Sequence, residues 1–197
     1  TASRIYRNYR LNKLNLKMIS HDLKCIFLHP NKCGGKSIEN TIWDIVPEPG
    51  SADHRTIENY IDEYGMEVVS NYYVFMFSRN PWERITSIYF GRKQILKVDM
   101  PSFEVFVKDL DPDNNPTKSQ LSWIKNKGDI VKPDFIGRVE NYQSDWKVVC
   151  DNLGITKELP HLNASKHMTY QNYYNDQLKD IIYDRYKSDI EFFNYKF

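Results

Sequence analysis

The sequence has 197 residues, a length that fits one domain with a substantial core. Its formal net charge is +1, from 27 basic and 26 acidic side chains, so no overall field recruits nucleic acid and any anion site must be local. Three widely spaced cysteines without a CxxC pair indicate neither a disulfide framework nor a zinc site. No apolar run approaches the roughly 20 residues of a membrane span, so we expect a cytoplasmic protein, or a lumenal one if an N-terminal anchor has been removed.

Residues 1–20 are basic and differ from the rest of the chain. They contain five cations spaced three or four residues apart and no acidic residue. This spacing would place the cations along one helical stripe. We expect a solvated arm, with a polyanion-binding or membrane-surface segment as the alternative, followed by one domain over residues 21–197. The cations are Arg4, Arg7, Arg10, Lys13 and Lys17.

The domain begins with a pattern of strand, loop and helix. Residues 25–28 are a short apolar run that Pro30 stops, as in a buried strand. Residues 38–46 then repeat apolar side chains at helical spacing until Pro47. The segment between them, HPNKCGGKS (residues 29–37), joins a strand end to a helix start, which is where a glycine loop binds phosphate.

A second unit of the same kind follows. We predict a helix over residues 57–68, an aromatic-rich strand over residues 72–77 and a helix opened by Pro81. Alternating strands and helices favour a three-layer, P-loop-like α/β fold, with a central, mainly parallel sheet flanked by helices. Ligands of such sheets bind beyond the carboxyl ends of the strands.

The rest of the chain predicts three helices and one strand. Helices are indicated at residues 103–110 and 144–153, and Gly154 suits the position after the second of these. A last helix starts near Asn175. Residues 134–137 are expected to form a short edge or inner strand of the sheet.

The loop at residues 29–37 differs from an ATP-binding loop. That motif needs a glycine where Pro30 stands, although Gly-Lys-Ser at residues 35–37 is in register. A triphosphate enzyme also needs a carboxylate for Mg²⁺ at a neighbouring strand end, where this chain has Ser78 and Arg79. Arginine offers a planar fork of donors for a phosphate dianion. We therefore expect a nucleotide held by protein cations, without a metal.

Two segments resemble the nucleotide-binding motifs of the sulfotransferase superfamily, in particular its Golgi-type carbohydrate branch and related small bacterial and viral enzymes. They are FLHPNKCGGKSIENTIW (residues 27–43) and YYVFMFSRNPWERITSIYF (residues 72–90). The second contains the complete family motif that starts at Arg79. The first departs from the family pattern at three positions, and segments near residues 134–141 and 186–195 extend the resemblance over nearly the whole chain after the arm. The three departures are Asn31, Cys33 and Lys36.

The resemblance implies 3′-phosphoadenosine 5′-phosphosulfate (PAPS) as donor, adenosine 3′,5′-bisphosphate (PAP) as product, no metal, and a hydroxyl acceptor on a carbohydrate. Lys32 is then expected to bind the 5′-phosphosulfate and to be catalytic, by stabilising charge on the leaving oxygen. Arg79 and Ser87 are expected to bind the 3′-phosphate. The other expected donor-binding positions are Cys33, Gly34, Gly35, Lys36, Ser37 and Lys166.

An alcohol acceptor also needs a base to take its proton, and histidine is suited to this near neutral pH. In this branch a histidine between the two motifs commonly has that role, which implies His54 as a catalytic residue. Glu39 is the alternative base, and His29 is expected to be a packed residue at a strand end. Two other interpretations stay open: a Mg²⁺-dependent kinase that uses residues 35–37, and a nucleotide- or polyanion-binding module without catalysis.

Overall fold

The computed structural model of the protein describes residues 17–44, 53–96, 99–160 and 168–197. Its central sheet has the strand order β1-β2-β3-β6. The strands β2 (Cys25–Leu28), β3 (Tyr73–Ser78) and β6 (Phe135–Arg138) are parallel, and β1 (Ile19–Ser20) runs antiparallel to β2. The predicted α/β fold with a mainly parallel sheet is confirmed. A separate two-stranded sheet consists of β4 (Lys125–Asn126) and β5 (Asp129–Ile130).

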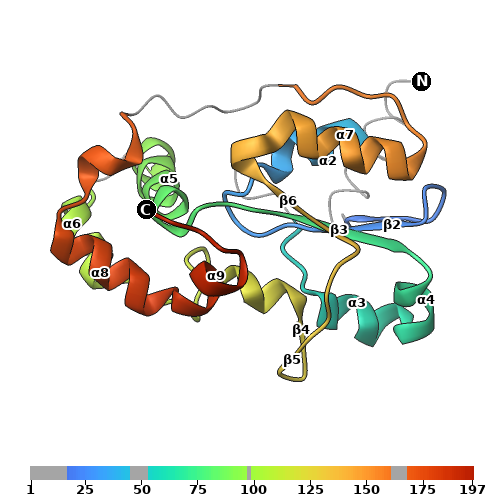
Figure 1. Cartoon of the computed structure of the whole chain (residues 1–197), viewed down its shortest axis with the longest axis horizontal. Helices are drawn as coiled ribbons and strands as arrows, with labels where there is room; N and C mark the ends of the chain where they lie inside the picture. Colours follow the sequence, from blue (N-terminus) through green and yellow to red (C-terminus); the bar gives the residue numbers. More distant parts are fainter. Residues whose placement is uncertain (1–16, 45–52, 97–98, 161–167) are drawn as a thin grey trace.

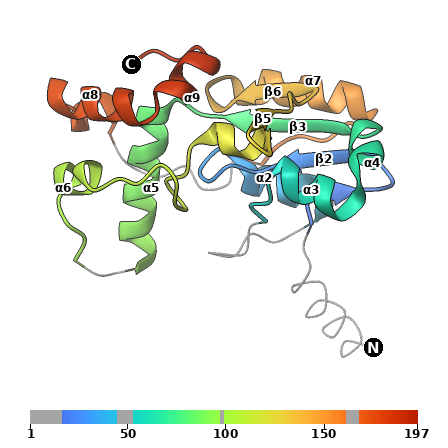
Figure 2. The same ribbon diagram turned by 90° about the horizontal axis from the view of Figure 1, so that it is seen from below.

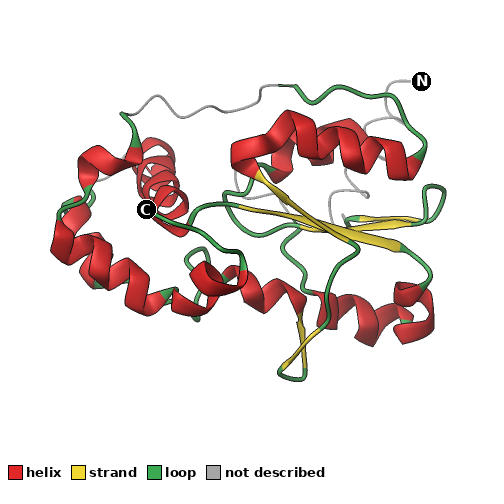
Figure 3. Ribbon diagram, viewed as in Figure 1, coloured by secondary structure: helices red, strands yellow, loops and turns green. Residues whose placement is uncertain are grey.

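Helices cover both faces of the central sheet. Figure 1 shows α2 (Gly35–Trp43) and α7 (Tyr142–Leu153) on one face, and α3 (Ile57–Tyr64) and α4 (Met66–Ser70) on the other. In Figure 3 the strands lie between these two helical layers.

A further group of helices lies beside the sheet, beyond the end of β3, as Figure 2 shows. It contains α5 (Pro81–Leu96), α6 (Phe103–Lys108) and α8 (Asp176–Arg185). The last helix, α9 (Lys187–Phe192), follows α8, and three short 3-10 helices are η1 (Gln120–Ile124), η2 (Val139–Asn141) and η3 (Tyr170–Tyr173).

The side chains of the inner strands alternate between two cores. Phe27 and Phe75, which are partners in the β2–β3 register, pack with residues of α2 and α7. Ile26 and Met76 pack on the other face with residues of α3. Because both faces of these strands are covered, their sequences are continuous apolar runs, and only the ends of the strands reach polar surroundings.

Two boundaries differ from those predicted from the sequence. The helix expected over residues 57–68 is two helices, α3 and α4, separated at Gly65, whose φ of 83° and ψ of 153° are accessible mainly to glycine. Met18 is fully buried and is followed directly by β1, so the end of the arm expected over residues 1–20 belongs to the domain. Residues 1–16 lie outside the described residues.

The other predicted elements lie close to their expected positions. The strand expected over residues 134–137 is β6, at the edge of the sheet. Gly154 ends α7 with a φ of 65°, and the Asn175 side chain caps α8 by accepting from the Leu178 N–H. Within the described ranges, no helix has both the length and the apolar character needed to cross a membrane.

Candidate functional site

The first predicted loop leaves β2 and enters α2. Lys32 and Gly34 have positive φ angles of 64° and 78°, so the chain turns sharply before Gly35 starts the helix. Gly34 is the N-cap and offers no capping side chain, and the first turn of α2 contains no acidic residue. N–H groups at a helix start, together with the helix dipole, favour an anion. The loop therefore has the geometry expected of a phosphate- or sulfate-binding element.

Packed aromatic rings explain both glycines of this loop. A Cβ on Gly35 would lie 2.0 Å from Nε2 of His29, and a Cβ on Gly34 would lie 2.9 Å from the ring of Tyr142. The Tyr142 hydroxyl donates to the Gly34 carbonyl oxygen at 2.5 Å, and burial raises its pKa, so it remains a donor. The two rings pack against the loop, and larger residues at these glycines would displace them.

The second predicted loop, after β3, brings Arg79 next to Lys32. Nη1 of Arg79 donates to the Lys32 carbonyl oxygen at 3.2 Å, and Nη2 forms an ion pair with Glu83 at 2.9 Å. Nε of Arg79 is buried and has no hydrogen-bond partner among the described residues. An unsatisfied buried donor costs about 1–3 kcal/mol, so a ligand acceptor here would be stabilising.

Lys32 is a half-buried cation with cationic neighbours. Its Nζ lies beside α5, where a Cβ added to Gly91 would be 3.2 Å away. In the part of the chain that the structure describes, no carboxylate pairs with this ammonium group. Burial, followed by the charges of Arg79 and Lys36, lowers the pKa of Lys32. An anion placed among these cations would reduce their mutual repulsion.

The other predicted donor-binding residues divide into three groups. Ser37 and Ser87 are buried, at 3% and 2% exposure, on α2 and α5 respectively. The Cys33 thiol points into the interior and donates to Oε1 of Gln120 at 3.2 Å, while burial raises its pKa to about 12. Cys33 can therefore serve the loop only through its backbone. Lys166 lies outside the described residues.

Gln120 is a site residue that the sequence analysis missed. Its side chain is fully buried and forms two hydrogen bonds of 2.9 Å with the backbone of Arg79, one to the carbonyl oxygen and one from the N–H. It also accepts from the Cys33 thiol, so it joins the two loops. Asp189 in turn accepts from the Gln120 N–H at 2.7 Å. No sequence motif marks this glutamine, which is 41 residues from Arg79.

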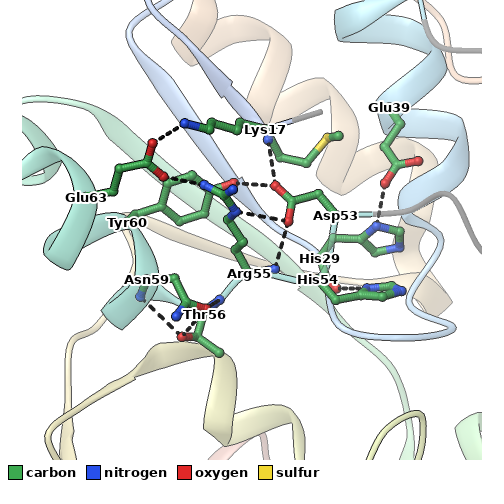
Figure 4. Close-up of polar contacts among 11 residues, drawn as sticks. Lys17, His29, Glu39, Asp53, His54, Arg55, Thr56, Asn59, Tyr60 and Glu63 are labelled. Atoms are coloured by element: carbon green, nitrogen blue, oxygen red, sulfur yellow. Dashed lines mark hydrogen bonds and ion pairs between the residues drawn. The ribbon is translucent and has the colours of Figure 1, made fainter. Parts of the chain in front are cut away.

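His54, the expected base, lies next to His29 at the end of β2 (Figure 4). Its Nδ1 is 2.8 Å from the His29 carbonyl oxygen. Because a carbonyl oxygen only accepts, Nδ1 of His54 carries the hydrogen and Nε2 is the basic nitrogen. Burial, followed by the neighbouring His29, lowers the pKa of His54 to about 4. At neutral pH His54 is thus uncharged and able to accept a proton.

Glu39 and His29 form a buried pair that the sequence analysis did not predict. Oε1 of Glu39 is 2.7 Å from Nδ1 of His29, and the two residues are only 1% and 4% exposed. The expectation that His29 is packed agrees with this position. Glu39 lies in the second turn of α2, where it bonds to His29. This burial favours His54 over Glu39 as the base.

A network of paired charges holds the chain before and after His54 (Figure 4). Asp53 accepts from the Met18 N–H at 3.2 Å and from the Tyr60 hydroxyl at 3.2 Å. Arg55 pairs with both Asp53 and Glu63, and Lys17 also pairs with Glu63. These contacts anchor the segment that carries His54 to the start of β1 and to α3. We name this set the Asp53 network: Lys17, Asp53, Arg55, Tyr60 and Glu63.

The end of β3 lacks the carboxylate of a magnesium-dependent kinase. Ser78 stands there, and its hydroxyl lies 2.9 Å from the Tyr195 hydroxyl and 3.2 Å from the Gly137 carbonyl oxygen. Across the described ranges, no three His, Cys, Asp or Glu residues are grouped so that they could hold a metal ion. The groups that surround the two loops are mainly cations and N–H donors, which suit an anion.

Comparison with known proteins gives two findings. The model of the sulfotransferase family matches residues 18–196. A protein of Archaeoglobus fulgidus, named an uncharacterized protein, is 36% identical over 98 residues, which cover 48% of this chain and 78% of that protein. Both loops, His54 and the His29–Glu39 pair lie within the residues that the family model matches.

Proposed function

The chain belongs to the sulfotransferase family, and we propose that it transfers a sulfuryl group from PAPS to a hydroxyl group of a carbohydrate. The main support for PAPS as the donor is the group of cations between the two loops. Lys32 has no carboxylate partner among the described residues, and the buried Nε of Arg79 has no described acceptor. A donor with several phosphate and sulfate oxygens supplies the missing acceptors. The carbohydrate acceptor is supported by the resemblance of the motif at Arg79 to the Golgi-type branch.

The residues present fit this donor at both of its charged ends. We place the 5′-phosphosulfate on Lys32 and on the start of α2, where the backbone of residues 33–37 and the side chains of Lys36 and Ser37 would hold it. Arg79 and Ser87 would hold the 3′-phosphate, and Lys166 is retained as a further donor-binding position. When bound, PAPS supplies an activated sulfuryl group attached to a phosphate leaving group.

In this proposal Lys32 and His54 have different roles in the transfer. The acceptor oxygen forms a bond to sulfur while the bond between sulfur and the bridging oxygen breaks, as in in-line phosphoryl transfer. Lys32 stabilises the negative charge that develops on the bridging oxygen. Nε2 of His54 takes the proton of the acceptor hydroxyl.

The low pKa of His54 applies to the protein without a bound anion. A group that titrates at about 4 is a weak base. Negative charges close to an imidazole favour its protonated form and so raise its pKa. A bound anionic donor would therefore strengthen His54 as a base, which couples proton acceptance to the presence of the donor.

Transfer can be tested with radiolabelled PAPS and a panel of carbohydrate, phenol and aliphatic alcohol acceptors, in the presence of EDTA. We expect label on a carbohydrate and a loss of about 10²- to 10⁴-fold in turnover in His54→Ala, because that is the usual contribution of a positioned base. PAP affinity should be unchanged in this variant. The matched control is His21→Ala, because His21 is an exposed histidine that contacts Tyr72 just before β3. Wild-type turnover in His54→Ala would contradict the proposed base, and absence of labelled product from every acceptor would contradict the proposed transfer.

A further inference from the structure

The His29 imidazole is held from several directions inside the domain. Its Nδ1 bonds Glu39, and its ring stacks on Phe27 with centroids 5.4 Å apart and planes inclined by 19°. The Nε2 side of the ring lies against Gly35, as the steric limit at that glycine shows. These contacts leave the ring one orientation between β2 and the start of α2.

Packing alone does not explain this buried pair. Removing a carboxylate and an imidazole from water is costly, and the bond between them only offsets that cost. Replacing a buried ionic pair by apolar side chains of similar volume is often neutral or stabilising. The His29 ring stacks on Phe27, which belongs to the apolar core on this face of the sheet. Two apolar residues could fill this space, so the polar pair points to another role.

That role is indicated by the contact between His29 and His54. The rings of His29 and His54 have centroids 4.8 Å apart and planes inclined by 55°. The carbonyl oxygen of His29 accepts from Nδ1 of His54, which fixes the tautomer. His29 thus contacts the base with its ring and with its backbone. The charged and titratable groups that act on His54 are His29 beside it, Glu39 on α2 and Arg84 on α5.

We propose that Glu39 and His29 are positioning residues, which hold the His54 imidazole in one orientation and in the Nδ1–H tautomer for proton transfer. Glu39 orients the His29 ring, and His29 orients His54, so Glu39 acts without touching substrate. The inference rests on the proposed function, because it needs His54 to be the base. The Asp53 network supports the same residue from the other side, through the backbone next to His54.

The direct test is two-bond ¹H–¹⁵N NMR of histidine-labelled full chain, which shows which ring nitrogen of each imidazole carries hydrogen. In the wild type we expect His54 as the Nδ1–H tautomer alone. In Glu39→Ala we expect a mixture of both tautomers. Glu39→Gln should restore the single tautomer, because its amide oxygen can still accept from Nδ1 of His29. Glu104→Ala is the matched control, since Glu104 pairs with Lys108 on the surface of α6.

A second variant keeps the test valid if Glu39→Ala does not fold. His29→Leu combined with Glu39→Leu should fold at least as stably as the wild type, yet it should show mixed tautomers at His54. Its kcat should fall about 10- to 100-fold, as expected for a misplaced catalytic group, while KM for PAPS and the affinity for PAP stay unchanged. A lower kcat together with an unchanged KM for PAPS and an unchanged PAP affinity separates a positioning role from a purely structural one.

The outcomes distinguish the two proposals. A single His54 tautomer and wild-type kcat in both Glu39→Ala and the double leucine variant would overturn the positioning role and leave the proposed function intact. A wild-type protein that does not bind PAP would overturn the proposed function itself, whatever the NMR spectra show.

Discussion

Two charged regions of the molecule differ in how their charges are matched. In the Asp53 network, each cation has a carboxylate: Lys17 pairs with Glu63, and Arg55 pairs with both Asp53 and Glu63. Between the two donor-binding loops, Arg79 reaches one carboxylate, that of Glu83, and Lys32 reaches none among the described residues. The first region is complete without a ligand, whereas the second is not.

This difference separates structural charges from binding charges. Paired charges at a surface add little free energy but fix the local chain. Half-buried cations that repel each other destabilise the free protein slightly and become favourable only when an anion arrives. By this criterion we assign Lys32 and Arg79 to the proposed donor site, and Lys17 and Arg55 to the fold. Substitutions in the two regions should therefore affect different measurements.

The largest difference is expected between two arginines. Arg79→Ala should weaken PAP binding about 100-fold, because it removes charge-assisted hydrogen bonds that contribute roughly 1.5–3 kcal/mol each. Arg55→Ala, the matched control in the Asp53 network, should leave PAP affinity unchanged. Calorimetric titration of both variants measures this. Equal losses of PAP affinity in the two variants would show that Arg79 acts no differently from an ordinary surface charge.

Glycine substitutions should sharpen the comparison through stability. Gly35→Ala places a Cβ 2.0 Å from Nε2 of His29, so it should lower the free energy of unfolding by about 2 kcal/mol, as overpacking does. Adding His29→Ala should remove the clash, so the double variant should be more stable than the sum of the single effects predicts.

Gly65 is the matched control for this coupling. Apart from its chain neighbours, no heavy atom of the described residues lies within 4 Å of a Cβ added there, and its φ is 83°, so Gly65→Ala should destabilise through backbone strain alone. Its effect and that of His29→Ala should then add. Chemical denaturation measures these effects. If the effects of Gly35→Ala and His29→Ala on the free energy of unfolding were also additive, this would contradict the contact between the loop and the His29 ring.

The sequence allowed the fold and the two loops to be predicted but not the contacts behind them. The strand, loop and helix units were visible because apolar periodicity and glycine are local signals. The His29–Glu39 pair was not visible, because it joins a strand end to the second turn of a helix and depends on how α2 lies on the sheet. Gln120 is similar, since its partners are distant in sequence. Gly65 was merged into one helix because the residues on both sides have helical patterns.

A pH experiment tests whether Lys32 belongs to the anion site. Its pKa in the free protein lies below the ordinary 10.5, and a bound anion favours the protonated form and raises that pKa. PAP affinity should therefore be full below the free pKa, fall as pH rises above it, and level off above the bound pKa. One unit of difference between these pKa values corresponds to a decrease of about tenfold.

Lys32→Arg is the control for that decrease. A guanidinium stays protonated across this range, so the variant should lose the decrease that titration of Lys32 causes. Titrations of PAP at several alkaline pH values, in buffers of different ionisation enthalpy, measure both affinity and proton uptake. Identical pH profiles of the wild type and Lys32→Arg would exclude Lys32 from the site.

The smallest effect is expected in the Asp53 network. Lys17→Ala removes an exposed pair with Glu63, so neither PAP affinity nor the thermal midpoint of unfolding should change resolvably. Differential scanning calorimetry with and without PAP gives both results. A clear loss of PAP-induced stabilisation in Lys17→Ala would mean that Lys17 contributes to anion binding and is not only a structural charge.

The most direct test of the central claim is calorimetric titration of the wild-type protein with PAP in EDTA, compared with ATP in the presence of Mg²⁺. The cations between the loops predict binding of PAP without metal, with a clear preference over ATP and Mg²⁺. Absence of PAP binding, or a preference for ATP with Mg²⁺, would contradict the donor site proposed here and support a metal-dependent nucleotide enzyme.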